Sequence, residues 1–257
     1  MWLFPLKMLI GMLVGLLVGL TGLGAGVLLL PILIFGLGVS PLVAVGSDAA
    51  FNAITKIGAG YLHWKRDTVD RRLIAGLSMG SIPAALGGVL LITHLRTAYG
   101  NELNSILRNA IGVLLVLIPL LLVLQNSPRQ YALVSNLSPK QFWPRVATVG
   151  LIAGFLIGVS SVGSGTIVML LLALLVQAAP ATLVGTDIVH AVIVTGITSV
   201  FYFRLGAVDT ALLIPLLLGS IPGALLGVKL ATRLPAVYLR RVLCVSLIAT
   251  GARMLWA

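Results

Sequence analysis

Two short motifs place a carboxylate inside an apolar stretch of the chain. They read Gly46-Ser47-Asp48 and Gly185-Thr186-Asp187, and each follows a proline, Pro41 or Pro180. A carboxylate inside a membrane is costly, so within a membrane-crossing segment it indicates function. Two roles stay open for each aspartate: it carries protons during coupled transport, or it caps or orients a helix start, which is a common role for aspartate.

Three further polar side chains lie in the same two stretches. Lys56 follows Asp48 by eight residues and Asn52 lies one helical turn from both, so all three are close to one helix face. A buried ammonium pairs with a carboxylate, binds a substrate anion, or extends to the membrane interface. His190 follows Asp187 by three residues and is a candidate proton relay, with simple packing as the alternative.

Clusters of glycine and hydroxyl residues form two candidate anion sites. They comprise Thr21, Gly22, Gly24 and Gly26, and Ser160, Ser161, Gly163, Ser164, Gly165 and Thr166. Free N–H groups at a helix N-terminus suit an oxyanion, and hydroxyl groups add donors. The alternative is that small residues only allow helices to pack closely, which is the interpretation we favour for Gly15 and Gly19.

The elements that must position these groups are membrane-crossing helices. Hydrophobic residues make up 59% of the 257 positions and charged residues only 9%, against about 25% in soluble domains. Apolar runs of the length needed to cross a bilayer, about 20 residues, recur along the chain. These runs do not alternate apolar and polar residues, which favours helices over barrel strands. The net charge of +11 comes mostly from short connections between runs.

Several kinds of chemistry are excluded by what the sequence lacks. Cys244 is the single cysteine, so an internal disulfide or a thiolate metal cluster cannot form. The three histidines are too scattered for metal-ligand spacing, and no phosphate-binding GxxxxGK[ST] loop is present. We therefore expect no metal site, no cofactor and no ATP-driven pumping. The basic charge fits anionic lipid and does not indicate a nucleic-acid partner.

An internal duplication organises the chain. An offset of 139 positions aligns Gly15 with Gly154 and carries the Gly-Ser-Ile-Pro sequence at 80–83 onto an identical one at 219–222. Each half contains four apolar segments. The expected divisions are a first transmembrane repeat at 1–124, a polar linker at 125–145 and a second repeat at 146–257.

The first segment of each repeat is too long for one straight crossing. A helix of about 33 residues would reach roughly 50 Å, whereas the hydrocarbon core is about 30 Å thick. Its glycine cluster predicts a break or a re-entrant turn. Basic residues concentrate at 65–72 in one half and at 233–241 in the other. Because basic loops stay cytoplasmic, this predicts an all-α polytopic protein with inverted repeats. Eight straight helices with parallel halves are the alternative.

The combined motifs resemble the TauE/SafE family of sulfite exporter-like permeases. The residues that carry the resemblance are Gly22–Gly26, Pro41, Ala44, Gly46, Ser47, His63, Val69, Asp70 and Gly80–Ala84, followed by Gly163–Gly165, Pro180, Gly185, Thr186, Val208, Asp209 and Gly219–Gly223. The resemblance implies transport of sulfite, a sulfonate or another sulfur oxyanion across a bacterial inner membrane. Where many members have Gly-Thr-Ser, this chain has Asp48 or Asp187 in the third position.

The sequence therefore predicts a permease for a small anion, working by alternating access, and not an enzyme. Its expected partners are the anionic solute and the lipid bilayer, with protons as the candidate coupling ion and a homo-oligomer left open. One alternative is a membrane enzyme acting on a lipid-linked anion, which would need acidic clusters and arginine within the membrane. The other is a receptor or scaffold that does not transport.

Overall fold

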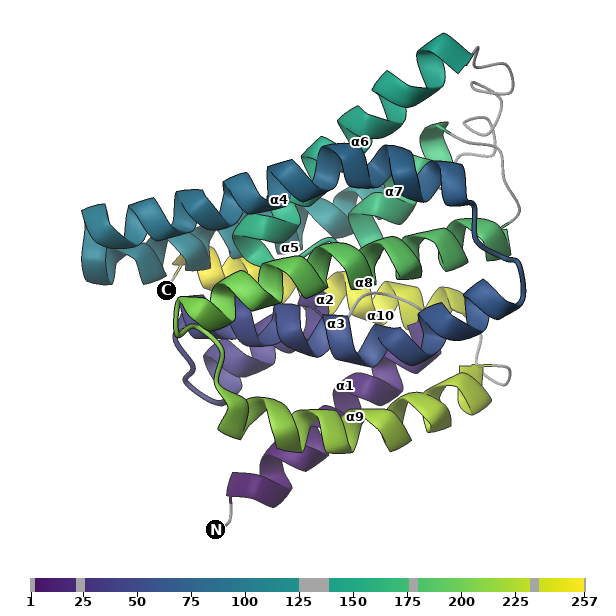
Figure 1. Ribbon diagram of the computed structural model, residues 1–257. Helices are drawn as coiled ribbons and strands as arrows, with labels where there is room; N and C mark the ends of the chain where they lie inside the picture. The colour runs from purple at the N-terminus through teal and green to yellow at the C-terminus, as the bar shows by residue number, and fades with distance from the viewer. Residues whose placement is uncertain (1–2, 22–25, 125–138, 176–179, 232–235, 257) are drawn as a thin grey trace.

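The protein is a bundle of helices (Figure 1). A computed structural model describes residues 3–21, 26–124, 139–175, 180–231 and 236–256, and within them every regular element is helical. The elements of the N-terminal half are α1 (Leu3–Thr21), α2 (Gly26–Pro31) continuing as a π-helical turn (Ile32–Gly36), α3 (Pro41–Lys65), α4 (Arg71–Tyr99), a 3-10 turn (Gly100–Glu102) and α5 (Leu103–Leu124). Those of the C-terminal half are α6 (Pro139–Ser160), α7 (Thr166–Leu175), α8 (Pro180–Arg204), α9 (Thr210–Ala231) and α10 (Ala236–Trp256).

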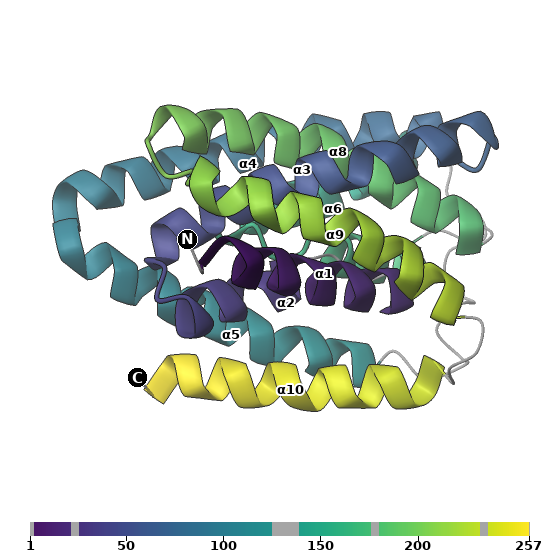
Figure 2. The ribbon, with the colours of Figure 1, turned by 90° about the horizontal axis from the view of Figure 1, so that it is seen from below.

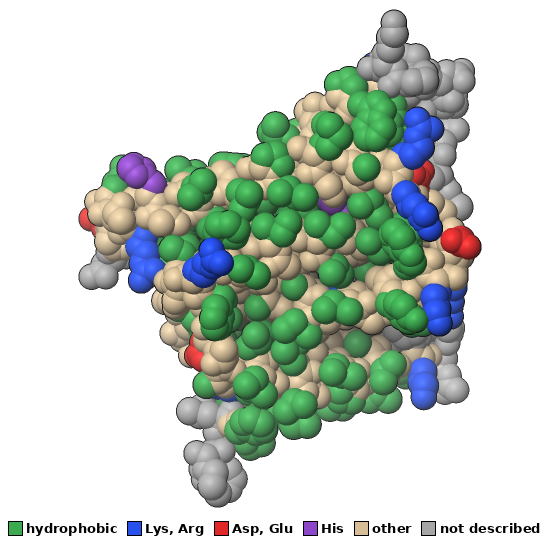
Figure 3. Space-filling model, viewed as in Figure 1, with side chains coloured by type: hydrophobic (Ala, Val, Ile, Leu, Met, Phe, Trp, Pro, Cys, Tyr) green, Lys and Arg blue, Asp and Glu red, His purple; other side chains and the backbone are tan. Residues whose placement is uncertain are grey.

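Five of the described helices contain a stretch long and apolar enough to cross a membrane. These stretches are Arg71–Tyr99, Leu103–Leu120, Gln141–Ser160, Ala181–Arg204 and Thr210–Gly227. Hydrophobic side chains cover the face of the molecule between its two ends, and lysine and arginine gather at the edges (Figure 3). This distribution is that of a multi-pass membrane protein, as the composition predicts.

Aspartate residues at two connections begin the helices that follow them. The Asp70 carboxylate accepts the backbone N–H of Arg72 at 2.9 Å and of Leu73 at 3.1 Å, where α4 starts. The Asp209 carboxylate accepts the N–H of Leu212 at 3.1 Å, where α9 starts. Both side chains therefore satisfy N–H groups that lack a partner within the helix.

Helix α6 begins earlier than the apolar pattern predicts. It starts at Pro139, inside the stretch 125–145 that the sequence analysis gave to a polar linker. A proline fits the first position of a helix because its fixed φ is already helical and its missing N–H is not needed there. The first turns of α6 contain Lys140, Gln141 and Arg145, which interrupt the apolar pattern, so hydrophobicity alone does not detect the start of this helix.

Small residues bring two pairs of helices into backbone contact. Gly15 of α1 faces the carbonyl of Ser220 in α9, and Gly154 of α6 faces the carbonyl of Ser81 in α4. In each case a Cβ would overlap the opposing backbone, so the packing role predicted for Gly15 is confirmed. Both pairs lie side by side in Figures 1 and 2. The two contacts are related by the sequence offset of 139 positions.

Helices α3 and α8 run antiparallel and lie side by side (Figure 1). Gly46, near the start of α3, faces the carbonyl of Ala207, which follows the end of α8. Gly185, near the start of α8, faces the carbonyl of Thr68, which follows the end of α3. These contacts are again reciprocal under the same offset, and they hold α3 against α8 along their length.

Candidate functional site

A break between α6 and α7 supplies one wall of the site. Helix α6 ends at Ser160, α7 begins at Thr166, and the five residues between them form turns. Within the break Gly163 and Gly165 have φ values of 104° and 131°, which glycine adopts freely, and Ser161 has a φ of 57°. The predicted interruption is therefore present in this half. The N–H groups of the first turn of α7 have no partner within the helix, and that of Ile167 donates to the Gly163 carbonyl in the break at 3.3 Å.

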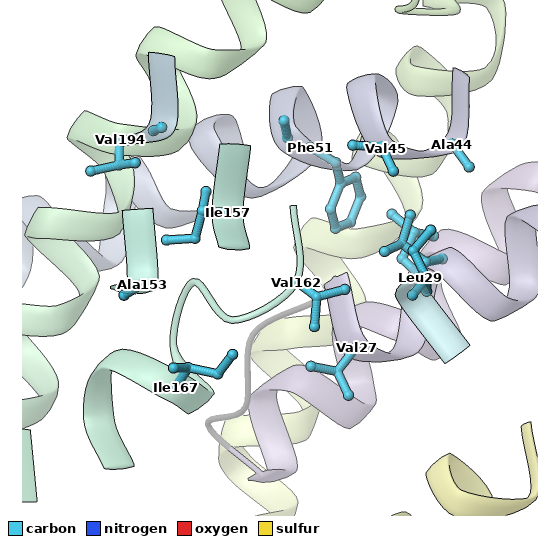
Figure 4. Close-up of a cluster of buried hydrophobic side chains, with 14 of the residues drawn as sticks. Val27, Leu29, Ala44, Val45, Phe51, Ala153, Ile157, Val162, Ile167 and Val194 are labelled. Atoms are coloured by element: carbon cyan, nitrogen blue, oxygen red, sulfur yellow. The ribbon is translucent and has the colours of Figure 1, made fainter. Parts of the chain in front are cut away.

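The corresponding region of the other half meets this break. Helix α1 ends at Thr21 and α2 begins at Gly26, while Gly22 and Gly24 lie outside the described residues. A Cβ on Gly26 would lie 2.6 Å from the Asp48 Oδ2 atom and 3.1 Å from the carbonyl oxygen of Ser161. In Figure 4 buried side chains of α2 and of the break lie close together. The start of α2, the middle of α3 and the break thus converge.

Asp48 is fully buried and joins α3 to the break. Its Oδ2 atom accepts the hydroxyl of Ser161 at 2.7 Å and the side-chain amide of Asn52 at 3.0 Å. The same Asn52 amide donates to the Asp48 backbone carbonyl at 3.1 Å. The interpretation of Asp48 as a cap for its own helix is wrong, because α3 begins at Pro41 and the carboxylate lies two turns inside. The carboxylate instead contacts the broken segment, and its orienting and proton-carrying roles stay predictions.

Lys56 makes the second contact between α3 and the break. Its ammonium donates to the backbone carbonyl of Ser164 and lies 3.4 Å from the Ser164 hydroxyl. The side chain therefore turns toward the break. Asp48 and Lys56 lie two helical turns apart on α3, so the break runs alongside this stretch of helix and is held at both ends.

Asp187 and His190 approach the same region from α8. Both side chains are buried, and the Lys56 ammonium lies within electrostatic range of each. The Nε2 atom of His190 is 2.7 Å from the Ser81 hydroxyl of α4. The Oδ1 atom of Asp187 and the Nδ1 atom of His190 are buried without a hydrogen-bond partner among the described residues. The proton relay between Asp187 and His190 stays a prediction.

Some predicted site residues have structural contacts instead. The Ser47 hydroxyl accepts the backbone N–H of Asp209 at 3.1 Å, and the Thr186 hydroxyl accepts that of Asp70 at 2.9 Å. These two residues therefore position the starts of α9 and α4, not the broken segment. The Ser160 hydroxyl donates to the carbonyl of Leu156 and closes the end of α6, so its proton is already used. For Thr21 and Thr166 the structure gives the position on the helix only.

Two residues near the site were missed by sequence reasoning. Tyr202 of α8 is fully buried and donates its hydroxyl to the carbonyl of Gly158, in the last turn of α6, at 2.6 Å. Ser81 of α4 contacts His190. The signal for Ser81 is its place in the repeated Gly-Ser-Ile-Pro sequence. Tyr202 gave no signal beyond being a polar aromatic residue in an apolar run.

The assembled groups suit the binding of a small charged solute. Lys56 and the first turn of α7 offer donors and positive charge, while Asp48 and Asp187 offer acceptors and negative charge. Among the described residues no group of three or more His, Cys, Asp or Glu side chains converges in a way that could hold a metal ion. Buried groups of both charges therefore lie beside the break.

Comparisons with known proteins identify the family of the chain. The family model described as Sulfite exporter TauE/SafE matches residues 7–254. The chain is 32% identical to a probable membrane transporter protein, YjnA, of Bacillus subtilis, over 96% of this chain and 98% of the relative. It is 24% identical to YdhB of the same organism, also a probable membrane transporter protein, over 83% of this chain and 84% of the relative. No solved structure matches. The chain belongs to the sulfite exporter TauE/SafE family, and it is a multi-pass membrane transporter and not an enzyme.

Proposed function

We propose that the protein is a secondary permease for a small anion, with a sulfur oxyanion such as sulfite or a sulfonate as the substrate class. The observation that carries the proposal is the position of Lys56, which lies against the break that opens α7. A half-helix N-terminus and an ammonium together favour a compact oxyanion. The description of the family supports the sulfur chemistry.

The two carboxylates require that a cation accompany the anion. Asp48 and Asp187 are buried near Lys56, and with all three groups ionised they exceed its charge. An added anion would be repelled unless one carboxylate is neutralised. A proton on Asp48 or Asp187 would neutralise one carboxylate. If protons are the coupling ion, a pH gradient is expected to drive uptake of the anion.

The proposed mechanism is alternating access between two inverted repeats, 1–124 and 146–257. It is supported by contacts that recur at an offset of 139 positions, α1 with α9 and α6 with α4. It is also supported by the antiparallel pair α3 and α8, because helices related by a two-fold axis in the membrane plane run in opposite directions. The links from Asp48 and Lys56 to the break join the two repeats at the site. We place the protein in a bacterial inner membrane.

The test is a binding and uptake panel with matched variants. Purified protein is heated with sulfite, thiosulfate, sulfate, taurine or sulfoacetate, and the stabilising solutes are then tested for uptake into liposomes. We expect one sulfur oxyanion to stabilise the wild-type protein, and Lys56→Met to abolish this stabilisation. Thr195→Val is the control, since Thr195 occupies the position equivalent to Lys56 and its hydroxyl donates to the carbonyl of Ala191 in its own helix.

Each result has a distinct meaning. Stabilisation with uptake supports the permease, and stabilisation without uptake favours a receptor. If Lys56→Met binds the sulfur oxyanion as the wild-type protein does, the Lys56 ammonium is not part of the anion site. No response to any sulfur oxyanion from folded protein would reject this substrate class.

A further inference from the structure

The Asp48–Asn52 pair contains two oxygen atoms for which the fold provides no donor. Both side chains have a relative exposure of 0%, and the Asp48 Oδ1 and Asn52 Oδ1 atoms have no hydrogen-bond partner among the described residues. A buried acceptor left without a donor costs about 1–3 kcal/mol. Such atoms in a native site call for a specific occupant.

The orientation of the Asn52 amide is fixed by its neighbours. Its nitrogen donates to the Asp48 carboxylate and to the Asp48 backbone carbonyl, which are both acceptors. Rotating the amide by 180° would place oxygen against two oxygens, so the nitrogen must stay on this side. The free Asn52 oxygen and the free Asp48 oxygen therefore belong to two side-chain groups that are joined by a hydrogen bond.

Partial negative charge lies on one side of the pair. Ser161, which donates to Asp48, directly follows the C-terminal end of α6, and that end of a helix carries partial negative charge. The Ser161 carbonyl also faces the space beside Gly26 and the Asp48 carboxylate. Lys56 acts on Asp48 only at a distance, because its ammonium is bound to Ser164. A water molecule would satisfy the free oxygens but would leave the buried charge uncompensated.

We propose that Asp48 Oδ1, Asn52 Oδ1 and backbone carbonyls at the end of α6 form a binding site for one sodium ion. Carboxylate, amide and carbonyl oxygens are the ligands that hard cations prefer. A single carboxylate matches a monovalent ion better than a divalent one. Half-helix C-terminal ends and unwound carbonyls are a recurrent setting for sodium in transporters with broken helices. The spacing of histidine and cysteine residues in the sequence gives no information on such a site, because its ligands are oxygen atoms.

The site is present once in the chain. At the offset of 139 positions the residue equivalent to Asn52 is Ala191, and the one equivalent to Ser161 is Gly22. The Asp187 region therefore lacks both the amide and the hydroxyl that fix the Asp48 carboxylate. The sodium ion would supply the compensating charge that anion binding requires, so the inference deepens the proposed function. Only the role of sodium in transport rests on that function; the binding of sodium does not.

The primary test measures sodium binding without any sulfur anion. Purified full-length protein is unfolded thermally in choline chloride at fixed pH and ionic strength, with choline replaced stepwise by sodium or by potassium. We expect sodium to raise Tm saturably in the wild-type protein, and potassium to do so less. Asn52→Leu and Asp48→Asn should weaken the apparent affinity for sodium at least tenfold. Thr55→Val is the control, because Thr55 bonds only to backbone carbonyls of α3.

Three outcomes would overturn the site. Equal Tm values in sodium and choline would do so on the wild-type protein alone, even where Asp48→Asn does not fold. An Asn52→Leu variant with unchanged affinity for sodium would show that the Asp48–Asn52 pair does not bind the ion. A Tm that responds to pH and not to sodium would assign the carboxylate to a proton. Anion binding is measured both in sodium and in choline, and binding in either medium supports the permease whatever sodium alone does to Tm, so the failure of one proposal is distinguishable from the failure of the other.

Discussion

Replacing Gly26 with alanine should uncouple α2 from the Asp48 carboxylate. The new Cβ would lie 2.6 Å from the Asp48 Oδ2 atom, well inside van der Waals contact, and 3.1 Å from the Ser161 carbonyl oxygen. Asp48 is enclosed, so its side chain escapes the overlap only by leaving Ser161 and Asn52. Otherwise α2 must move away from α3, which would open the convergence point of the site.

The magnitude follows from the bonds at Asp48. Hydrogen bonds to a charged group contribute about 1.5–3 kcal/mol each, so losing two costs about 3–6 kcal/mol. Alanine in a helix gains about 1 kcal/mol over glycine. The net destabilisation of Gly26→Ala is therefore roughly 2–5 kcal/mol. Gly58→Ala is the matched control, because Gly58 lies on α3 with no atom within 4 Å of its added Cβ, and it should gain up to about 1 kcal/mol.

A double-mutant cycle with Ser161→Ala tests the reasoning. In Ser161→Ala the Asp48 carboxylate has already lost one of the two bonds, so Gly26→Ala should cost less there than in the wild-type background. The free energy of unfolding is measured in mixed micelles of increasing SDS fraction, and uptake is measured in liposomes. Strictly additive costs, or a Gly26→Ala variant as stable as Gly58→Ala, would refute the contact between α2 and Asp48.

Two further substitutions test the packing around the site. Gly154→Ala should lower Tm strongly because its Cβ would overlap the backbone of Ser81 in α4. Gly87→Ala is the control and should leave Tm unchanged or slightly raised, because the space around its new Cβ is open. Equal effects of the two substitutions on Tm would contradict the close approach of α4 and α6. Tyr202→Phe leaves the buried Gly158 carbonyl without its donor and should cost about 1–3 kcal/mol in unfolding free energy, and a variant as stable as the wild-type protein would show that the carbonyl has another donor.

The helical class and the break were predictable from local chemistry. Apolar runs without alternation specify helices in a membrane, and the glycines at 163 and 165 adopt φ values that other residues avoid. Asp70 and Asp209 cap the helices that start directly after them, and this contact too is local in the sequence. Each of these features depends on residues close together in the sequence.

The partners of the polar residues depend on tertiary packing and were not predictable. Asp48 and Lys56 contact a break more than a hundred positions away. Ser47 and Thr186 have the right type for a site, but their hydroxyls face the starts of helices from the opposite half. Periodicity places Asn52 on the face of Asp48, yet only the packed structure reveals that its oxygen lacks a donor.

The polar residues of the site differ between α3 and α8, although reciprocal glycine contacts link these two helices. The reciprocal contacts of Gly46 and Gly185 give both halves the same frame, whereas Lys56 has Thr195 as its equivalent. A duplicated frame supplies two related arrangements of one bundle, which alternating access requires. It does not require two copies of the binding groups, and a second buried ammonium would add a charge that needs its own compensation. The two halves can therefore keep the same helix packing while their binding residues differ. Substitutions of the polar residues of α3 are expected to change binding more than folding.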